Sequence, residues 1–167
     1  VELFGGDEGS IRIFKTYIGD GRNLAPDDIR YSRNVCILGM DVVDRLFPFE
    51  DPISKKIQIN GLDYYVIGIA ERKGEAFGQS QDNYIAIPIS NYLEKFSNKW
   101  TTLSINIEAS SEQTYDKTKD EAIGLMRSIR KVKPGEDNDF EVVTNAEMIE
   151  TFSGFTSGIK LFALSVS

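Results

Sequence analysis

The sequence predicts an α+β fold that consists of a strand-rich lobe followed by a smaller β-α-β lobe. Two strand-like runs, 55–60 and 64–69, meet at Asn60-Gly61, the residue pair most typical of a tight β-hairpin. A long amphipathic pattern at 110–131 lies between two further strand-like runs, which is the order of a β-α-β unit. The 167 residues are 41% apolar and 27% charged, as is ordinary for a folded globular chain.

Charge and composition exclude several classes of function. The net charge is −7, whereas nucleic acid requires a cationic surface, so we expect no nucleic-acid partner. The chain has no histidine, which excludes Ser-His-Asp catalysis, Cys-His catalysis and histidine-based zinc chemistry. Its one cysteine, Cys36, can form no internal disulfide and no cysteine metal cluster. We therefore expect a chain that is not an enzyme and holds no cofactor or metal.

Residues 1–100 form the predicted strand-rich lobe, together with an N-terminal connecting segment. The expected strands are 1–6, 35–38, 55–60, 64–69 and 83–87, and the expected short helices are 41–47 and 91–96. Strand pairing in this lobe is expected to be mostly antiparallel. The run 11–18 fits either a strand or a short helix, the segment Gly19–Arg22 ends it, and Pro26-Asp27-Asp28 predicts a polar turn.

Residues 101–144 form the predicted β-α-β lobe. Its strands are expected at 103–108 and 140–143, on either side of the helix at 110–131. That helix is long enough for a right-handed crossover between parallel strands. The chain therefore predicts a second, smaller sheet with one helix packed on it.

Residues 145–167 predict a final helix that leads toward a transmembrane span. Five large apolar residues recur at spacings of four and three, which gives one seam with the 3.5-residue period of coiled helices. They are Met148, Phe152, Phe155, Ile159 and Phe162. Gly154 and Gly158 add a GxxxG pattern, and the sequence ends inside an apolar stretch, so we expect a piece of a longer membrane protein. The alternative is that the seam faces the core of the domain.

Two segments outside the regular elements are candidate sites. The first is the glycine-rich loop 74–81, whose candidate partner-contact residues are Gly74, Phe77, Gly78 and Gln79. An apolar ring on such a loop is typical of contact with a partner or a membrane surface, and the alternative is that Phe77 folds back onto the domain. In the second segment, Arg22 is expected to form a buried ion pair with Asp27 or Asp28 that locks the turn.

Several short motifs occur in one order along residues 15–90, and their combination is specific although each one alone is weak. They are Gly21-Arg22, Asp27-Asp28, Val35–Gly39, Leu46–Pro48, Asp51–Ile53, Lys55–Ile57, Val66–Ile69, Asp82-Asn83 and Ile87-Pro88. Through these motifs the chain resembles the MacB-like periplasmic core domain of ABC transporter permeases of the MacB/FtsX/LolC type.

The resemblance implies an inner-membrane protein with four transmembrane helices, in which this domain lies on the periplasmic side between the first and second spans. It implies a strand-rich Sabre-like lobe over about 20–100. The β-α-β lobe at 101–144 would be the second half of a Porter-like lobe, whose first β-α-β unit the sequence lacks. Family members usually carry glycine where this chain has Ser54, so the turn before the strand at 55–60 is expected to differ.

The function that the resemblance implies is mechanical and non-catalytic. A separate cytoplasmic ABC ATPase domain or subunit binds ATP, and its motion reaches this domain through the membrane helices. The helix that holds the seam from Met148 to Phe162 is the candidate coupling element. Further partners implied are a second permease, as a homodimer or heterodimer, and a periplasmic adaptor. The motion would drive export or extraction of a periplasmic substrate.

A ligand-sensing or partner-binding periplasmic domain is the alternative function. Its ligand would be an antimicrobial peptide or a lipoprotein, or it would regulate a cell-wall hydrolase. This alternative predicts a pocket with convergent polar groups.

Overall fold

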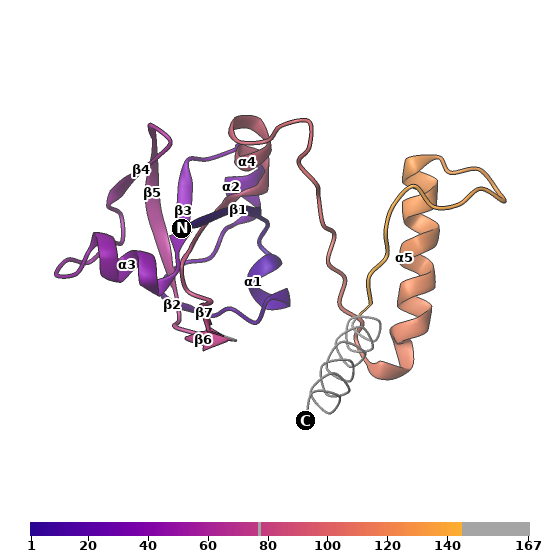
Figure 1. The fold of residues 1–167 in the computed structure, drawn as a ribbon, viewed down its shortest axis with the longest axis horizontal. Coiled ribbons are helices and arrows are strands. Elements are labelled where there is room, and N and C mark those ends of the chain that lie inside the picture. The colour runs from indigo at the N-terminus through magenta and orange to yellow at the C-terminus, as the bar shows by residue number, and fades with distance from the viewer. Residues whose placement is uncertain (77, 145–167) are drawn as a thin grey trace, which may run out of the picture. The chain divides into compact units, whose positions relative to one another are not determined.

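The computed structural model describes residues 1–76 and 78–144 of the chain. The chain divides into two compact units, Val1–Glu108 and Ala109–Ser167. Figure 1 shows the strands gathered in the first unit and a single long helix, drawn in orange, in the described part of the second. The predicted helix at 145–167, with its seam from Met148 to Phe162, lies outside the described residues.

Within residues 1–76 and 78–108, six strands form one sheet in the order β1-β8-β3-β5-β2, with β4 also paired to β5. The strands are β1 (Glu2–Gly6), β2 (Ile18–Gly21), β3 (Val35–Leu38), β4 (Lys56–Ile59), β5 (Leu62–Ala70) and β8 (Tyr84–Pro88). Two very short strands, β6 (Glu75–Ala76) and β7 (Gln79–Ser80), form a separate hairpin.

The sheet is mixed, and most of its strand pairs are antiparallel, as expected. The antiparallel pairs are β4 with β5, β2 with β5 and β3 with β8, and the turn between β4 and β5 places Asn60 at φ +49° and Gly61 at φ +81°, the left-handed pair that a tight hairpin requires. Two pairs are parallel, β1 with β8 and β3 with β5. Parallel partners are joined by long crossovers, which leave no local turn signal in the sequence.

Four short helices accompany the sheet in the described residues of the first unit. They are α1 (Ser10–Ile13), α2 (Pro26–Arg30), α3 (Met40–Leu46) and α4 (Ile89–Lys95). Helices α3 and α4 confirm the predictions at 41–47 and 91–96. The ambiguous run 11–18 divides between α1 and β2, and the predicted break at Gly19–Arg22 is wrong because Ile18–Gly21 is a strand.

Helix α2 replaces the polar turn predicted at Pro26-Asp27-Asp28. Proline suits the first helical position, where its missing N–H would have no partner in the helix. The carboxylate of Asp28 accepts a hydrogen bond from the backbone N–H of Ala25 at 2.9 Å. This side-chain cap closes the first turn of the helix, and so the segment becomes helical instead of remaining a turn.

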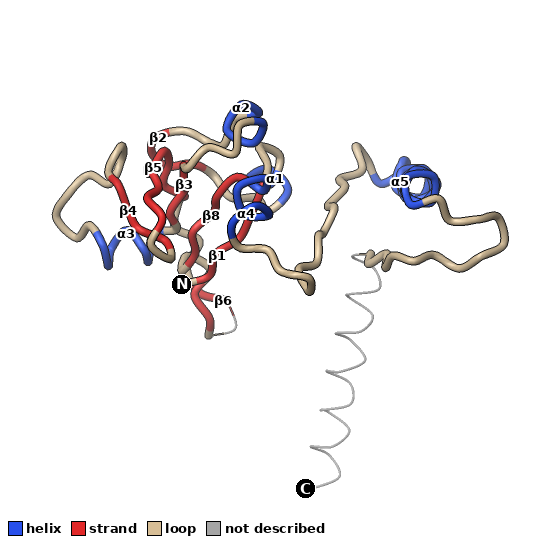
Figure 2. Tube along the Cα trace, turned by 90° about the horizontal axis from the view of Figure 1, so that it is seen from above, coloured by secondary structure: helices blue, strands red, loops and turns tan. Residues whose placement is uncertain are grey.

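Both faces of the central strands are buried. Along β3, Cys36 and Leu38 join one apolar cluster and Ile37 joins another, as expected for side chains that alternate across a sheet. Helix α3 contributes to the first cluster and helix α2 to the second, on opposite sides of the strands (Figure 2). Burial on both faces explains why 35–38 is a continuous apolar run instead of an alternating one.

The described part of the second unit holds the single 3-10 turn η1 (Glu112–Thr114) and the helix α5 (Tyr115–Arg130). The helix predicted at 110–131 is thus confirmed over most of its length. Helix α5 has no buried residue, and its apolar side chains Leu125 and Ile129 are 63% and 65% exposed. Among the described residues, no helix has the length and apolar character needed to span a bilayer.

The two strands predicted beside that helix are wrong. Neither 103–108 nor 140–143 pairs with another strand in the part of the chain that the structure describes. An alternating pattern determines which side chains share a face, but a strand forms only where a neighbouring edge supplies hydrogen bonds. Leu103, Ile105 and Ile107 are accordingly 60%, 68% and 55% exposed.

Candidate partner-binding site

The segment predicted as a glycine-rich contact loop forms a short hairpin. Strands β6 and β7 pair Ala76 with Gln79, so the expectation of a loop outside the regular elements is wrong. Gly78 lies in the turn at φ +77° and Gly74 precedes β6 at φ +86°, conformations that glycine adopts without strain. Phe77, the apolar residue of this segment, lies outside the described residues.

Asp82 fixes the base of the hairpin. This residue is only 1% exposed, and its carboxylate accepts hydrogen bonds from the backbone N–H of Lys73 at 2.9 Å and of Gly74 at 2.8 Å. Its own backbone N–H donates to the hydroxyl of Ser80 at 3.0 Å. Because one buried carboxylate and its backbone contact residues on both arms, the two arms enter and leave the hairpin in a fixed geometry.

Helix α3 is tied to the hairpin by a second set of polar contacts. The Ser80 hydroxyl donates to the carboxylate of Asp41 at 2.5 Å, and Arg72 donates to Asp41 at 3.2 Å. Arg72 also pairs with Asp44, and this hydrogen bond raises the pKa of the guanidinium above its ordinary value. These pairs are partly exposed and stabilise the fold little. Their main effect is to orient the hairpin relative to helix α3.

Gly39 allows the strand before α3 to approach the hairpin base. A Cβ atom at this position would lie 2.2 Å from the carbonyl oxygen of Asp82. The same approach lets the backbone N–H of Asp41 donate to that carbonyl oxygen at 3.2 Å, and the N–H of Gly39 donate to the carbonyl of Tyr84 at 3.0 Å. The sequence alone did not indicate that Gly39, Asp41, Arg72 and Asp82 support the predicted contact loop.

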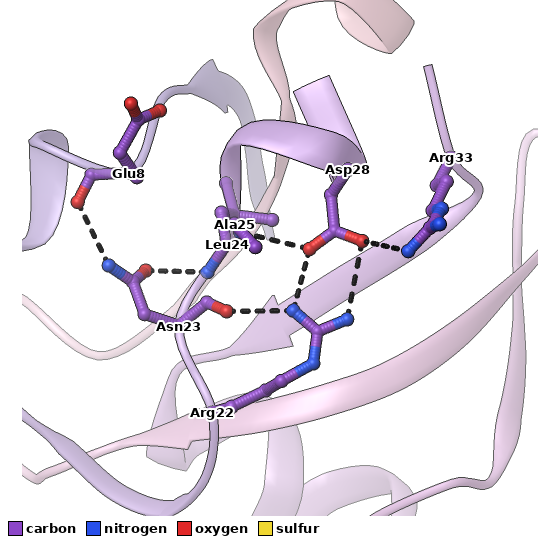
Figure 3. A network of polar contacts seen from close by, with 7 residues as sticks. All are labelled: Glu8, Arg22, Asn23, Leu24, Ala25, Asp28 and Arg33. Atoms are coloured by element: carbon purple, nitrogen blue, oxygen red, sulfur yellow. Dashed lines mark hydrogen bonds and ion pairs between the residues drawn. The ribbon is translucent and has the colours of Figure 1, made fainter. Parts of the chain in front are cut away.

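The predicted ion pair of Arg22 forms with Asp28 (Figure 3). Arg22 donates to both carboxylate oxygens, at 2.6 and 3.2 Å, and Asp28 is 0% exposed. Asp27, the other candidate, is exposed in the first turn of α2. Arg33, which the sequence did not indicate, donates to the same carboxylate at 3.3 Å.

The protonation of Asp28 follows from these contacts. Burial acts to raise the pKa of its carboxyl group, but the hydrogen bonds from Arg22, Ala25 and Arg33 outweigh burial and lower it below the ordinary value. The Asp28 hydrogen bond likewise raises the pKa of the Arg22 guanidinium. Both groups are therefore charged at neutral pH. The predicted burial of the pair holds for Asp28 only, because the Arg22 side chain is 48% exposed, and the pair joins Arg22 to helix α2 instead of closing a turn.

A groove of about 900 Å³ opens on the first unit. Its walls come from β1, α1, β8, α4 and the extended segment 101–106. The side-chain oxygen of Asn83 is buried in this wall and has no hydrogen-bond partner among the described residues. Burial also raises the pKa of the neighbouring Tyr84 to about 12. The groove is therefore lined by both apolar and polar side chains, and the Asn83 oxygen lies beneath its surface.

Other buried polar groups of the first unit are internally satisfied. The Tyr64 hydroxyl donates to Asn91, whose amide donates to the Ser32 carbonyl at 2.7 Å and to the Asn34 side chain at 2.9 Å. The Cys36 thiol is fully buried, and burial raises its pKa to about 12, so it stays protonated. Within residues 1–76 and 78–144, no group of histidine, cysteine or acidic side chains is arranged to hold a metal ion.

Residues 1–125 match the MacB-like periplasmic core domain. The chain belongs to this family and is therefore a periplasmic domain of an ABC transporter permease of the MacB type. The fold agrees with this assignment, because an α+β unit with a mixed sheet is also what the solved structures of similar domains contain.

Two similar proteins are macrolide export ATP-binding/permease proteins MacB. The protein from Chlorobium luteolum is 29% identical over 152 residues, which cover 91% of this chain and 22% of that protein. The protein from Chlorobium phaeobacteroides is 29% identical over 157 residues, which cover 94% of this chain and 23% of that protein. The chain thus spans less than a quarter of the length of these relatives.

Two solved structures share the fold. The periplasmic region of MacB from Actinobacillus actinomycetemcomitans superposes with a TM-score of 0.65 at 21% identity, covering 90% of this chain and 64% of that one. The extracellular domain of the ABC-type transporter YknZ from Gram-positive bacteria gives a TM-score of 0.59 at 19% identity. The superposition covers 78% of this chain and 65% of that one.

Proposed function

We propose that this chain is a non-catalytic extracytoplasmic module that transmits ATP-driven motion of membrane helices to export or extraction of a periplasmic substrate. Family membership supports this role, and the observation that carries it is the hairpin β6–β7 mounted on a rigid sheet. A module that transmits motion must move as one body and present a fixed contact point. The hydrogen bonds that Asp82 makes to both arms of the hairpin supply that fixed mounting.

The body behind the hairpin has the packing that such a role needs. Two apolar clusters bury both faces of the central strands. The Asp28 carboxylate holds α2 to the segment after β2, and Asn91 holds α4 to the residues before β3. Because these contacts join elements from the whole first unit, a force applied at one end is expected to displace the unit as a whole.

We assign two segments of this chain to different partners. Gly74, Gly78 and Gln79 of the hairpin segment, together with Phe77, are proposed to contact a partner outside the membrane, such as a periplasmic adaptor or the second permease of a homodimer or heterodimer. The segment with Met148, Phe152, Phe155, Ile159 and Phe162 is proposed to couple the module to the transmembrane helices and, through them, to a cytoplasmic ATPase. The relatives are named for macrolide export, so a macrolide is the first cargo to test.

The test uses the complete permease with its ATPase in proteoliposomes. Phe155→Asp or Ile159→Asp is expected to abolish macrolide transport while ATP hydrolysis continues, and the isolated 167-residue chain should still fold. Phe77→Asp is expected to reduce transport in the same way. Phe49→Asp is the matched control, because Phe49 is an exposed aromatic residue (97%) on a different loop. Transport that survives the Phe155 and Ile159 changes intact would refute the coupling role.

The alternative function, a ligand-sensing domain, is supported by the groove. Its walls combine apolar and polar side chains, which suits an amphipathic ligand. If the domain is a sensor, titration of the isolated chain with a macrolide or an antimicrobial peptide should raise its unfolding temperature. Ile105→Asp, at a groove residue that is 68% exposed, should abolish that rise and leave the unfolding temperature of the free chain nearly unchanged.

A further inference from the structure

The carboxylate of Asp28 is shared by two arginines, so these three side chains together carry one positive charge. Arg22 donates two hydrogen bonds to it and Arg33 donates one. The chain as a whole carries a net charge of −7. A local cationic centre in an acidic protein attracts anions to one defined place.

Both guanidinium groups keep N–H donors that no described residue accepts. An arginine has five N–H donors. Arg33 uses one of them, on Asp28, and Arg22 uses three, on Asp28 and on the carbonyl of Asn23. The two side chains are 50% and 48% exposed. The remaining donors can therefore be reached from solvent.

A largely exposed tyrosine borders Arg33. The Arg33 guanidinium lies over the ring of Tyr31, 5.9 Å from its centroid, and Tyr31 is 63% exposed. Arginine and tyrosine are among the residues most enriched where proteins bind one another. We call Arg22, Arg33 and Tyr31 the two-arginine surface.

Asp28 holds this surface in place before any ligand arrives. The carboxylate is buried and accepts four hydrogen bonds, three from the arginines and one from Ala25 (Figure 3). Long arginine side chains normally lose conformational freedom when they bind, and that loss weakens binding. Here the shared carboxylate has already restricted both side chains.

We propose that the two-arginine surface binds carboxylate side chains of an acidic segment in a partner protein. The planar fork of a guanidinium matches the two oxygens of a carboxylate, and the Tyr31 ring provides area for the neighbouring residues of the segment. A protein segment is favoured over a small molecule, because small molecules bind in concave sites and none of these three residues lines the groove.

The experiment measures binding of the 167-residue chain to a short fluorescein-labelled peptide that contains Glu and Phe, by fluorescence anisotropy at low salt. The same peptide with Gln in place of Glu is the ligand control. Arg33→Gln is the test variant, because Asp28 keeps its contacts with Arg22 and Ala25 and the fold should persist. Arg45→Gln is the matched control, since Arg45 is an exposed arginine on helix α3.

The Glu peptide is expected to bind, and Arg33→Gln should raise its Kd about tenfold, the typical effect of losing a hydrogen bond between charged groups. Arg45→Gln should change the Kd less than twofold, and the Gln peptide should bind at least tenfold more weakly. Equal effects of the two substitutions would overturn the proposal, because they would indicate general charge attraction. Equally strong competition by inorganic phosphate would also overturn it, because it would identify a site for small anions.

Discussion

At the scale of single residues, the buried carboxylate of Asp28 holds together the network that the sequence predicted in part. A charge removed from water is stable only when donors surround it, and here two guanidinium groups and one backbone N–H do so. The sequence predicted a pair of Arg22 with Asp27 or Asp28, since neighbouring carboxylates cannot be distinguished by composition. The side-chain cap of α2 selects Asp28 over Asp27, because the Asp28 carboxylate accepts hydrogen bonds from both the Ala25 N–H and Arg22.

Arg33 could not have been assigned to this network from the sequence. It reaches Asp28 because the chain reverses direction after α2, where Ser32 adopts a left-handed conformation at φ +45° and the Arg33 N–H donates to the Asp28 carbonyl. Serine seldom adopts a left-handed conformation, so Ser32 does not predict such a turn. The contact therefore depends on a local backbone conformation that no spacing rule indicates.

We expect Arg22→Ala to lower the free energy of unfolding by about 2–3 kcal/mol. Removing one partner of a buried charge is costly, and the half exposure of the arginine moderates the cost. Urea unfolding followed by circular dichroism measures the change. Arg45→Ala is the control and should alter stability by less than about 0.5 kcal/mol. An equal effect of both substitutions would show that the Asp28 pair contributes nothing specific.

The pH dependence of stability should reveal the same carboxylate. The pKa of Asp28 is lower in the folded chain than its ordinary value, so its contribution is present at neutral pH and is lost as the pH falls below about 4. Asp28→Asn removes this titration. The difference in unfolding free energy between the natural chain and Asp28→Asn should therefore be larger at pH 7 than at pH 3. A difference that stays constant would contradict a lowered pKa.

At the scale of elements, the signals that succeeded are local ones. Asn60-Gly61 predicted the hairpin β4–β5 because the two residues themselves adopt the turn conformation. The run 103–108 was predicted as a strand from its alternation, but pairing depends on a distant edge that alternation does not specify. The hairpin β6–β7 was missed for the opposite reason, because its base is fixed by Asp82 and helix α3 instead of by its own residues.

Gly39→Ala should destabilise the first unit by about 1–3 kcal/mol, the usual cost of inserting atoms into a packed site. The added Cβ would meet the backbone oxygen of Asp82 at 2.2 Å, and the backbone cannot turn aside as a flexible side chain can. Thermal unfolding measures the loss. Gly9→Ala is the control, because its added Cβ would meet a neighbouring atom at an ordinary 3.4 Å, and stability there should change little.

At the scale of the whole molecule, the first unit has two apolar clusters, whereas helix α5 in the described part of the second unit has no buried residue. The composition and strand patterns predicted an α+β fold, and the mixed sheet agrees with it in class. The sheet order could not be predicted, because β1 and β8 or β3 and β5 come together only through crossovers. Helix α5 was predicted correctly from its 3.6-residue pattern, although it has no buried residue in the described part of the second unit.

The fragment 1–108 is expected to fold by itself. It contains both apolar clusters and the networks around Asp28, Asp82 and Asn91. Its free energy of unfolding in urea, followed by far-ultraviolet circular dichroism, should match that of the first transition of the 167-residue chain within about 1 kcal/mol. A fragment that is unfolded at neutral pH would show that residues after 108 are required for the stability of the sheet.

The parallel pair β1–β8 has a consequence for the chain during its synthesis. Leu3 pairs with Ile85, so β1, which precedes the other strands of this sheet in the sequence, must wait for its partner for on the order of 4–16 s at ordinary rates of translation. Nascent chains stalled before Tyr84 emerges are expected to be cut readily by a protease, and those stalled after Pro88 emerges should resist it. Among the strands of this sheet, β1 is thus exposed without a partner until β8 has been translated.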